Sequence, residues 1–402
     1  MSEGSSLGGT AESLRSEPLP SEPPAEEPLR LCLVTETFSP EINGVARTLD
    51  QLVRGMMARG HRVEVVHPRR RGVAEDVEHF LVPGLPLPGY PELRFGLPVA
   101  RRLRRRWSQD PPTVVHVATE GPLGFAATFT ARKLGIPVLS TFHTNFHDYG
   151  RHYGYGLLRR AVLAGMRYFH NRTAATLVPT EEIRRGLESS GFQRVGVLAR
   201  GVDTKLFSPQ RRDDELRARW DARPSAPVLS YVGRIAGEKD VALALEAFRR
   251  ARRAVPDSRA VVVGDGPHRQ RSEEAYPEVV FCGMRTGEDL GRHYASGDVF
   301  VFPSRTETFG NVVLEAMASG LVVVAFDRAA AHELIVSGEN GFTVPGDDRQ
   351  ELAELAAAVA RRPLDELRAI GARARVTALG SGWDAVVKRY EAALFGVLTG
   401  GS

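Results

Sequence analysis

The chain has 402 residues, 42% of them apolar and 25% charged, which is the composition of a folded globular protein and excludes a disordered or fibrous one. Its two cysteines, Cys32 and Cys282, indicate neither a disulfide framework nor a thiolate metal site, which fits a reducing cytoplasm. The net charge is +4, but residues 1–27 carry six Glu and one Arg, so the remainder is basic and suits an anionic partner.

The N-terminal segment, residues 1–28, is rich in Ser, Glu, Pro and Gly and has almost nothing to bury, so it is predicted to be a disordered acidic tail. It lacks the charged and apolar regions of a signal peptide, and no apolar run of the chain approaches the ~20 residues needed to span a bilayer. We therefore expect neither secretion nor membrane spanning.

From residue 29 onward, β-branched runs alternate with longer amphipathic stretches. The predicted strands are residues 29–35, 62–68, 79–83, 113–119, 137–143, 174–179 and 195–199, and the predicted helices are residues 44–59, 98–107, 122–134, 155–172 and 181–189. Such β–α alternation predicts a parallel, doubly wound sheet with helices on both faces.

A polar, turn-rich segment at residues 199–214 interrupts the pattern, which then begins again. The second series predicts strands at residues 227–233, 259–264, 279–283, 298–304, 321–326 and 341–345, and helices at residues 238–254, 267–275, 287–296, 311–319, 331–336, 348–361, 364–377 and 381–397. We therefore predict an α/β chain of two doubly wound, Rossmann-like domains, residues 29–205 and 206–378, that face a central cleft. Ligands of such sheets bind at the carboxyl ends of the strands.

The stretch TETFGNVVLEAMASG, residues 306–320, directly follows one predicted strand. A helix that starts near Gly310 or Asn311 would expose free N–H groups to an anion in the cleft, with Asn311 as a possible cap. Glu315 on the second turn could accept two hydroxyl hydrogen bonds, as from a ribose diol, and Glu307 could accept hydroxyls at the other end of the ligand. The alternative is an ordinary capped helix with solvated carboxylates.

The stretch VGRIAGEK, residues 232–239, places Gly233 and Arg234 at a strand end and Lys239 five residues later, at the start of a helix. Two cations beside a glycine turn suit a diphosphate, although solvated surface cations would give the same pattern. The spacing is that of neither a P-loop nor a GxGxxG turn, so nucleotide binding would be of another kind.

In the first domain, TETFSPEINGV brings Gly44 to the start of a long helix, where a phosphate could approach the backbone or where Gly44 simply makes a turn. Next, His143 follows a strand directly, with His147 and His152 behind it. Zinc binding by His143 and His147 is disfavoured because the HExxH glutamate is missing. One functional imidazole and a structural histidine both stay open, and no metal is predicted.

Two basic clusters, RRLRRRW at residues 101–107 and the helix at residues 157–172, combine cationic and apolar faces. They suit an anionic membrane surface, and the alternative is that they are solvated faces of helices packed on the sheet. Neither lies in a known nucleic-acid-reading motif, so no nucleic acid is expected as a partner.

Taken together, NGV, FHT, GR with a following EK, GDGP and SRTETFGNVVLEAMASG resemble the retaining glycosyltransferases of family 4, which have the GT-B fold, over about residues 30–395. Within that family the motifs are most similar to bacterial α-mannosyltransferases that use GDP-mannose, followed by sulfoquinovosyl transferases. The resemblance implies a GDP-mannose donor or a UDP-sugar, a lipid or glycolipid acceptor, no required cofactor, and a cytoplasmic enzyme at the inner membrane face.

The resemblance also implies roles for single residues. Glu307 would contact sugar hydroxyls and Glu315 the ribose, with His143 beside the transferred sugar. The remaining contacts would come from the backbone of Phe309, Gly310 and Asn311, from Gly44, Gly233, Arg234 and Lys239 around the diphosphate, and from Met284 and Arg285 near the base. Residues 379–402 would form a helix that crosses back to the first domain. Many relatives have two glycines where this chain has Asn43 and Gly44.

Two functions of other classes stay open on the sequence. A non-catalytic, two-lobed sugar-binding protein is disfavoured by the missing signal peptide and the phosphate-directed cations. A nicotinamide-dependent dehydrogenase is disfavoured because neither domain offers the glycine fingerprint after its first strand.

Overall fold

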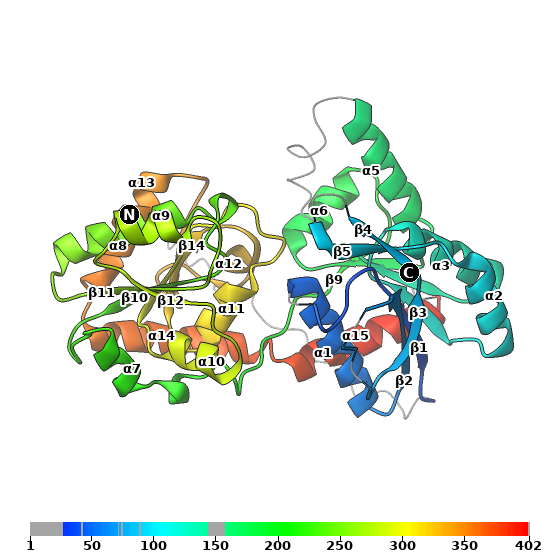
Figure 1. Cartoon of the computed structure of the whole chain (residues 1–402), viewed down its shortest axis with the longest axis horizontal. Helices are drawn as coiled ribbons and strands as arrows, with labels where there is room; N and C mark the ends of the chain where they lie inside the picture. Colours follow the sequence, from blue (N-terminus) through cyan, green and yellow to red (C-terminus); the bar gives the residue numbers. More distant parts are fainter. Residues whose placement is uncertain are drawn as a thin grey trace, which may run out of the picture.

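The computed structural model describes residues 27–400, with the exception of residues 42, 71, 74, 88–89 and 144–156. Two α/β halves lie side by side, each built around its own parallel sheet (Figure 1). The prediction of two doubly wound sheets is therefore confirmed. The predicted acidic tail lies outside the described residues except for residues 27 and 28.

The first sheet has seven parallel strands in the order β3-β2-β1-β6-β7-β8-β9. Its strands are β1 (Arg30–Val34), β2 (Arg62–Pro68), β3 (Glu78–Val82), β6 (Val114–Val117), β7 (Val138–Thr141), β8 (Ala175–Val178) and β9 (Val195–Val197). The helices between them are α1 (Gly44–Ala58), α2 (Ala100–Gln109), α3 (Pro122–Lys133), α5 (Leu157–His170) and α6 (Glu181–Ser189).

Side-chain alternation along β1 explains why helices cover both faces of this sheet. Leu31 and Leu33 join the apolar cluster of α1, whereas Cys32 and Val34 point the other way into the cluster of α2 and α3. Successive strand residues face opposite sides of the sheet, so a strand that is apolar at every position must be covered on both faces. The continuous run LCLV meets that condition.

The second sheet has six parallel strands in the order β12-β11-β10-β13-β14-β15 around one continuous apolar core. Its strands are β10 (Val228–Val232), β11 (Arg259–Val263), β12 (Val280–Gly283), β13 (Val299–Phe302), β14 (Val322–Phe326) and β15 (Phe342–Val344). The helices are α7 (Asp214–Arg219), α8 (Val241–Ala254), α9 (Arg269–Ala275), α10 (Gly287–Ala295), α11 (Asn311–Ala318), α12 (Ala329–Leu334), α13 (Arg349–Ala360) and α14 (Leu364–Leu379), with 3-10 turns η1 (Pro209–Arg211) and η2 (Gly237–Lys239).

Each sheet has one point where the chain reverses its direction of winding. In the first sheet it lies between β1 and β6, and in the second between β10 and β13. The loops that follow these strands diverge and leave a crevice at the carboxyl edge, which is where ligands of open α/β sheets bind. The fold thus places the loops after β1, β10 and β13 at the positions best suited to hold a ligand.

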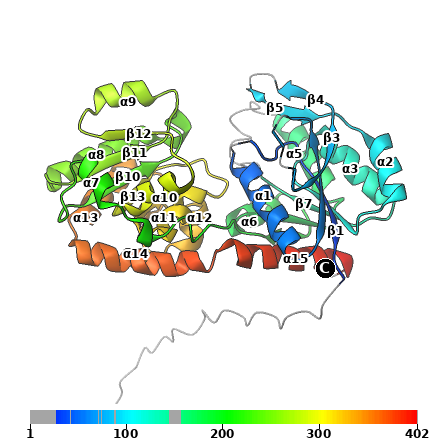
Figure 2. The same cartoon turned by 60° about the horizontal axis from the view of Figure 1, so that its bottom comes forward.

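The chain crosses between the halves twice, and the two crossings contact each other. The backbone N–H of Val202 donates to the carbonyl of Ser381 over 3.0 Å. After α14 beneath the second half, α15 (Trp383–Leu398) runs beneath the first (Figure 2). There Tyr390 is buried and its hydroxyl lies 2.6 Å from Nδ1 of His116 on β6. The last helix is therefore part of the first half's core.

The structure differs from the sequence prediction at one element in particular. An antiparallel hairpin, β4 (Gly84–Leu87) and β5 (Tyr90–Gly96), lies between β3 and α2, where no strand was predicted. Its prolines remove backbone donors and argue against a place in a sheet interior, and the hairpin indeed stands outside the seven-stranded sheet. Among the described residues, no helix is both long and apolar enough to cross a bilayer.

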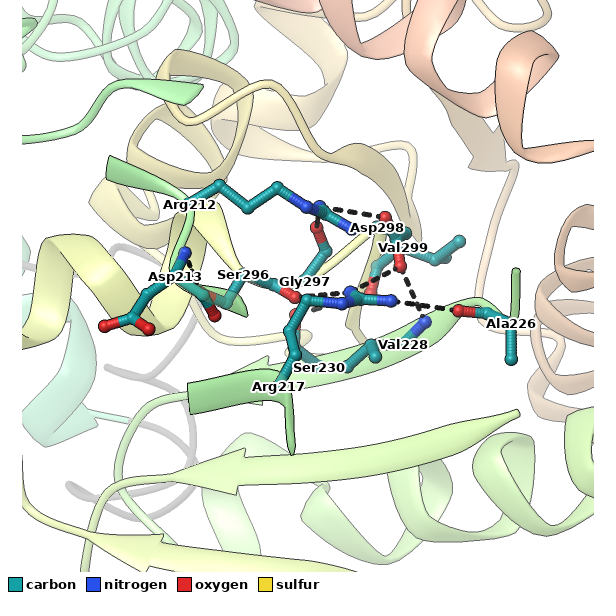
Figure 3. Close-up of polar contacts among 10 residues, drawn as sticks. All are labelled: Arg212, Asp213, Arg217, Ala226, Val228, Ser230, Ser296, Gly297, Asp298 and Val299. Carbon is teal, nitrogen blue, oxygen red and sulfur yellow. Dashed lines mark hydrogen bonds and ion pairs between the residues drawn. The ribbon is translucent and has the colours of Figure 1, made fainter. Parts of the chain in front are cut away.

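A buried ionic network joins α7 to the amino ends of β10 and β13 (Figure 3). Asp298 accepts hydrogen bonds from Arg217 over 3.0 Å, from Arg212 over 3.1 Å and from the backbone of Val228 over 2.8 Å. Arg217 and Asp298 are only 3% and 4% exposed. Because both charges are desolvated, loss of the Asp298 carboxylate would leave the Arg217 guanidinium uncompensated in the core.

We expect Asp298→Asn to lower the free energy of unfolding by about 3 to 5 kcal/mol, because it strands the Arg217 guanidinium in the core. Urea unfolding followed by circular dichroism measures this. The matched control, Asp257→Asn, removes a carboxylate that pairs with Arg223 at the surface, where the side chain of Arg223 is 65% exposed and that of Asp257 is 58% exposed. This variant should lower the free energy of unfolding by less than about 1 kcal/mol. Equal effects of the two variants would contradict the buried network.

Candidate functional site

A cleft of about 1030 Å³ lies between the two halves at the carboxyl edges of their sheets. All of the residues selected from the sequence line it: Gly44, His143, Gly233, Arg234, Lys239, Met284, Arg285, Glu307, Phe309, Gly310, Asn311 and Glu315. They come from loops and from the first turns of helices, and lie up to 271 positions apart, from Gly44 to Glu315. Parallel strands make this convergence possible because their carboxyl ends share one edge.

The start of α11 shows why glycine follows Phe309. Gly310 has φ +88° and ψ 62°, a left-handed conformation that side chains disfavour. Phe309 is 3% exposed, and its carbonyl accepts from the N–H of Ala330 over 2.8 Å, which fixes the turn. Asn311 is the first helical residue and makes no capping bond, so the prediction of an Asn311 cap is wrong. The first N–H groups of α11 are thus free of a side-chain cap.

Glu307 lies in the loop after β13 and pairs with a cation from the loop after β10. Its Oε1 lies 2.5 Å from Nζ of Lys239 and accepts from the Ser304 hydroxyl over 2.8 Å. Both charged side chains are partly buried: that of Lys239 is 25% exposed and that of Glu307 is 18% exposed. Lys239 belongs to η2 and precedes α8, so its predicted place at the start of a long helix is off by one short turn.

Glu315 lies on the second turn of α11, on a different part of the cleft wall from Glu307. Its Oε2 accepts a hydrogen bond from the Tyr294 hydroxyl over 2.8 Å. Burial raises the pKa of Glu315 above its ordinary value, although the bond from Tyr294 works in the opposite direction. A carboxylate of this kind is a strong acceptor for ligand hydroxyl groups.

The glycine loops after β10 and β11 are packed backbone to backbone. A Cβ on Gly264, which has φ +140°, would lie 1.9 Å from the carbonyl oxygen of Gly233. The N–H of Ile235 donates to the carbonyl of Asp265 over 2.9 Å. This contact holds the turn of Gly233 and Arg234 at the cleft. The side chain of Arg234 is 64% exposed, and its Nη1 lies 3.5 Å from Oε1 of Glu238. Arg234 is therefore accessible to a ligand.

The loop after β12 supplies the outer wall. Met284 is 64% exposed, which is high for a large apolar side chain. Arg285 donates to the carbonyl of Cys282 over 2.7 Å and to Asp289 over 3.2 Å, so its guanidinium is fixed in place. An exposed thioether beside a fixed guanidinium offers a flat, partly apolar surface.

In the first half, the start of α1 faces the start of α11 across the cleft. A Cβ on Gly44 would lie 3.9 Å from Nδ2 of Asn311. Asn43 caps α1 by accepting from the N–H of Ala46 over 2.8 Å, and its amide donates to Thr37 over 2.8 Å. Two helix amino ends thus converge on one small volume, and their positive ends can bind an anion there.

His143 follows β7 and lies at the cleft wall. Its Nδ1 is 3.5 Å from a guanidinium nitrogen of Arg200, and its Nε2 is buried without a hydrogen-bond partner among the described residues. Burial lowers the pKa of His143 well below its ordinary value, and the charge of Arg200 lowers it further. His147 and His152, considered with it in the sequence, lie outside the described residues.

Comparison with known proteins decides the family. The model for Glycosyltransferase Family 4 matches residues 42–206, and the model for Glycosyl transferases group 1 matches residues 226–362. The chain is 34% identical over 377 residues to the GDP-mannose-dependent alpha-mannosyltransferase of Mycobacterium tuberculosis, covering 90% of this chain and 97% of that protein. The chain belongs to glycosyltransferase family 4.

Two further similarities place this glycosyltransferase among relatives with other names. It is 27% identical over 356 residues to the alpha-monoglucosyldiacylglycerol synthase of Streptococcus pneumoniae, covering 84% of this chain and 80% of that protein. The crystal structure of HepE from Anabaena in complex with UDP superposes with a TM-score of 0.74 at 18% identity, over 91% of this chain and 100% of that one. This structural likeness confirms the GT-B fold.

Arg200 and Glu36 are among the residues of the glycosyltransferase cleft that were not selected from the sequence. Arg200 lies in the segment that was interpreted as a polar domain boundary, and Glu36 belongs to the stretch TETFSPEINGV, from which only Gly44 was selected. Both come directly after strands of the first sheet, β9 and β1. The rule that ligands bind beyond strand carboxyl ends would have found them if applied to every strand.

Glu36 occupies a slot between two glycines. Its Oε2 accepts from the N–H of Gly96 on the hairpin, and its Oε1 accepts from the N–H of Leu123 at the start of α3 over 3.3 Å. A Cβ on Gly121 would lie 2.3 Å from Oε1. Burial raises the pKa of Glu36 to about 7. Glu36 thus fastens the hairpin to the cleft wall.

The raised pKa of Glu36 predicts a pH-dependent stability. The folded state holds the Glu36 proton more tightly than the unfolded state, so the free energy of unfolding should fall as pH rises from about 4.5 to about 7, by about 3 kcal/mol in total. Urea unfolding at pH 5 and pH 8 should show this loss in the native protein and a smaller loss in Glu36→Gln. The exposed control Glu339→Gln should behave like the native protein. If Glu36→Gln loses as much stability between pH 5 and pH 8 as the native protein does, the pH dependence comes from other groups.

Proposed function

We propose that this glycosyltransferase transfers mannose from GDP-mannose to a hydroxyl group of a lipid or glycolipid, with retention of the α configuration. The observation that supports it most is the convergence of two helix amino ends, at Gly44 and Asn311, in a cleft that the carboxylates of Glu307 and Glu315 also line. A nucleotide diphosphate sugar has the matching groups, a dianion with hydroxyls on either side of it. The name of the M. tuberculosis relative supports GDP-mannose.

In this proposal each part of the donor has its own contacts. The diphosphate lies between the helix starts and accepts from Arg234, Lys239 and the backbone around Phe309, Gly310 and Asn311. Glu307 accepts from hydroxyls of the sugar, and Glu315 accepts from the ribose. Gly44 and Gly233 leave room for the phosphates, His143 lies beside the sugar, and Met284 and Arg285 lie near the base. All of these residues line the cleft.

The chemical step asks mainly for stabilisation of the leaving group. As the bond from the sugar anomeric carbon to the phosphate oxygen breaks, negative charge grows on the diphosphate, which positive charges and N–H donors stabilise. The acceptor oxygen bonds to the anomeric carbon on the same face, and its proton passes to the departing phosphate oxygen. Glu307, already bonded to Lys239 and Ser304, serves to position the sugar rather than to attack it.

A lipid acceptor is supported by the hairpin beside the cleft. Leu85, Phe95 and Leu97 are 58%, 40% and 37% exposed, and Phe95 lines the cleft together with Arg94. Apolar side chains exposed together on one hairpin can contact acyl chains at the membrane surface. The diacylglycerol in the name of the S. pneumoniae relative points to the same acceptor class.

A UDP-sugar is the second candidate donor, because HepE, a protein of the same fold, was crystallised with UDP. We expect calorimetry to show tighter binding of GDP than of UDP, and GDP-mannose to release GDP when lipid extract is present. Lys239→Met should lower kcat about 100- to 1000-fold, because a donor to the leaving group is lost. Lys133→Met, which removes an exposed lysine of α3, should change little.

Each outcome of this experiment has its own meaning. Tighter binding of UDP, with turnover of a UDP-sugar, would replace the proposed donor. Native turnover no faster than that of Glu307→Ala with every donor and acceptor would favour a non-catalytic sugar-binding protein. Mass spectrometry of the lipid extract identifies the acceptor.

Membrane association is a separate part of the proposal. On α2, Arg101, Arg104 and Arg105 are exposed, whereas Arg106 pairs with Glu64 and Glu78 and is unsuited to bind lipid. Exposed arginines near an anionic bilayer are each worth about 1 kcal/mol. The basic face of α2 thus suits an anionic inner membrane surface.

We expect the protein to sediment with anionic vesicles at low salt, and the triple variant Arg101→Ser, Arg104→Ser, Arg105→Ser to partition about 100-fold more weakly. The matched control changes three exposed arginines of the second half to serine, Arg253, Arg271 and Arg368, at the same net charge. Equal loss in both variants would show an effect of net charge alone. Undiminished sedimentation of the α2 variant would remove α2 from the membrane contact.

A further inference from the structure

Arg200 is a buried cation at the floor of the cleft. It follows β9 in the segment that leads into the second half, and it is 6% exposed. Among the described residues, no carboxylate lies within ion-pair distance of its guanidinium, although Glu307 acts on its charge from farther away. Burial lowers the pKa of Arg200 to about 10, which leaves it charged at neutral pH. A buried charge of this kind carries a desolvation cost that hydrogen bonds must offset.

One part of the guanidinium fastens the first turn of α1. Nη1 of Arg200 donates to the carbonyl of Gly44 over 2.9 Å and to the hydroxyl of Thr48 over 2.6 Å. The Thr48 hydroxyl in turn donates to the same Gly44 carbonyl over 2.7 Å. These three bonds fix the helix start that faces Asn311 across the cleft.

The other part of the guanidinium faces His143. Nη2 of Arg200 lies 3.5 Å from Nδ1 of His143. A guanidinium has hydrogen-bond donors and no acceptor, so Nδ1 must accept and the imidazole proton must sit on Nε2. Nε2 is the buried atom of His143 that has no partner in the described part of the chain. The tautomer therefore leaves the buried Nε2–H as an unused donor of a residue that lines the cleft.

The surroundings of His143 keep the imidazole neutral. Burial lowers the pKa of His143 most, and the charge of Arg200 lowers it further. The neighbouring imidazoles of His116 on β6 and His170 on α5 are themselves neutral at neutral pH, because burial lowers the pKa of each to about 3. His116 is held by Tyr390 and Thr141, and His170 is held by Ser140. A neutral imidazole with Nδ1 occupied cannot accept a proton from a hydroxyl group at that nitrogen.

We propose that Arg200 is a positioning residue that locks His143 as its neutral Nε2–H tautomer, so that His143 donates a hydrogen bond to the ligand and does not act as a general base. This rests on the proposed function only in naming the ligand group, a hydroxyl of the transferred sugar. By fixing Gly44 with the same side chain, Arg200 also sets His143 and the start of α1 at a constant separation.

Nitrogen-15 NMR of the histidine side chains tests the tautomer without any donor. Native His143, identified by the signals lost in His143→Gln, should show the Nε2–H tautomer and no titration from pH 5 to pH 8. Arg200→Met should show a substantial Nδ1–H population, and Arg200→Lys, which keeps a donor and the charge, an intermediate one. Arg375→Met removes another guanidinium that binds main-chain carbonyls, of Thr204, Phe207 and Ala318, and should leave His143 unchanged.

Several results would overturn the proposal. These are an Nδ1–H tautomer or a titrating His143 in the native protein, or an unchanged His143 signal in Arg200→Met. If circular dichroism shows Arg200→Met to be unfolded, the NMR spectra of the native protein and of Arg200→Lys take its place. In that case, a His143 tautomer population in Arg200→Lys that equals the one in Arg375→Met would contradict the proposal.

Kinetics with the donor separates this inference from the proposed function. Arg200→Met should lower kcat at least tenfold, the equivalent of one lost hydrogen bond. Calorimetric binding of GDP alone should change less than threefold, because the Asn43 cap and the Thr48 hydroxyl still hold the first turn of α1. A purely structural role would weaken GDP binding and kcat together, which would contradict the proposal. If no donor is turned over, the proposed function fails while the tautomer measurement still stands.

Discussion

Unsatisfied backbone N–H groups at helix starts are the constraint on which this structure depends. A parallel sheet places the helix that follows each strand with its amino end at the carboxyl edge, so each half carries its free donors on one side. The two halves turn those sides toward each other, and Gly44 and Asn311 bring two helix starts close together. Gly44 and Gly310 add no side chain at these starts, and the side chain that lies nearest to Gly44 is that of Asn311.

The charges around this space are held in three different ways. Arg234 is exposed and paired only loosely with Glu238 at 3.5 Å, whereas Lys239 is bound tightly to Glu307. Arg200 is buried against backbone and hydroxyl oxygens rather than carboxylates. An anion entering the cleft therefore meets Arg234 as an accessible cation, Lys239 as a cation shared with a carboxylate, and Arg200 as a cation whose position is already fixed. Little reorganisation is left for the ligand to induce at the floor of the cleft.

The sequence was sufficient to predict the two sheets and to select a set of residues that all line one cleft, because hydrophobic periodicity and the loops after strands are local signals. It was insufficient for Glu36, whose environment depends on Gly96 and Gly121, 60 and 85 positions away. The same holds for Arg200, whose partners Gly44 and Thr48 lie on α1. The hairpin escaped prediction because prolines mask a strand pattern at a position outside the main sheet. Long-range partners, not local propensity, decided each of these features.

The last helix has a consequence for how the chain is made. Val386, Val387, Tyr390 and Leu394 of α15 belong to the same apolar cluster as the residues of β1 and α1. During synthesis the first half emerges before α15, so the part of this sheet face that α15 covers stays exposed until residues 383–398 have left the ribosome. The first half therefore completes its core only after the second half has been translated, and the two halves cannot mature strictly one after the other. Removal of α15 would thus damage the half that is farthest from it in sequence.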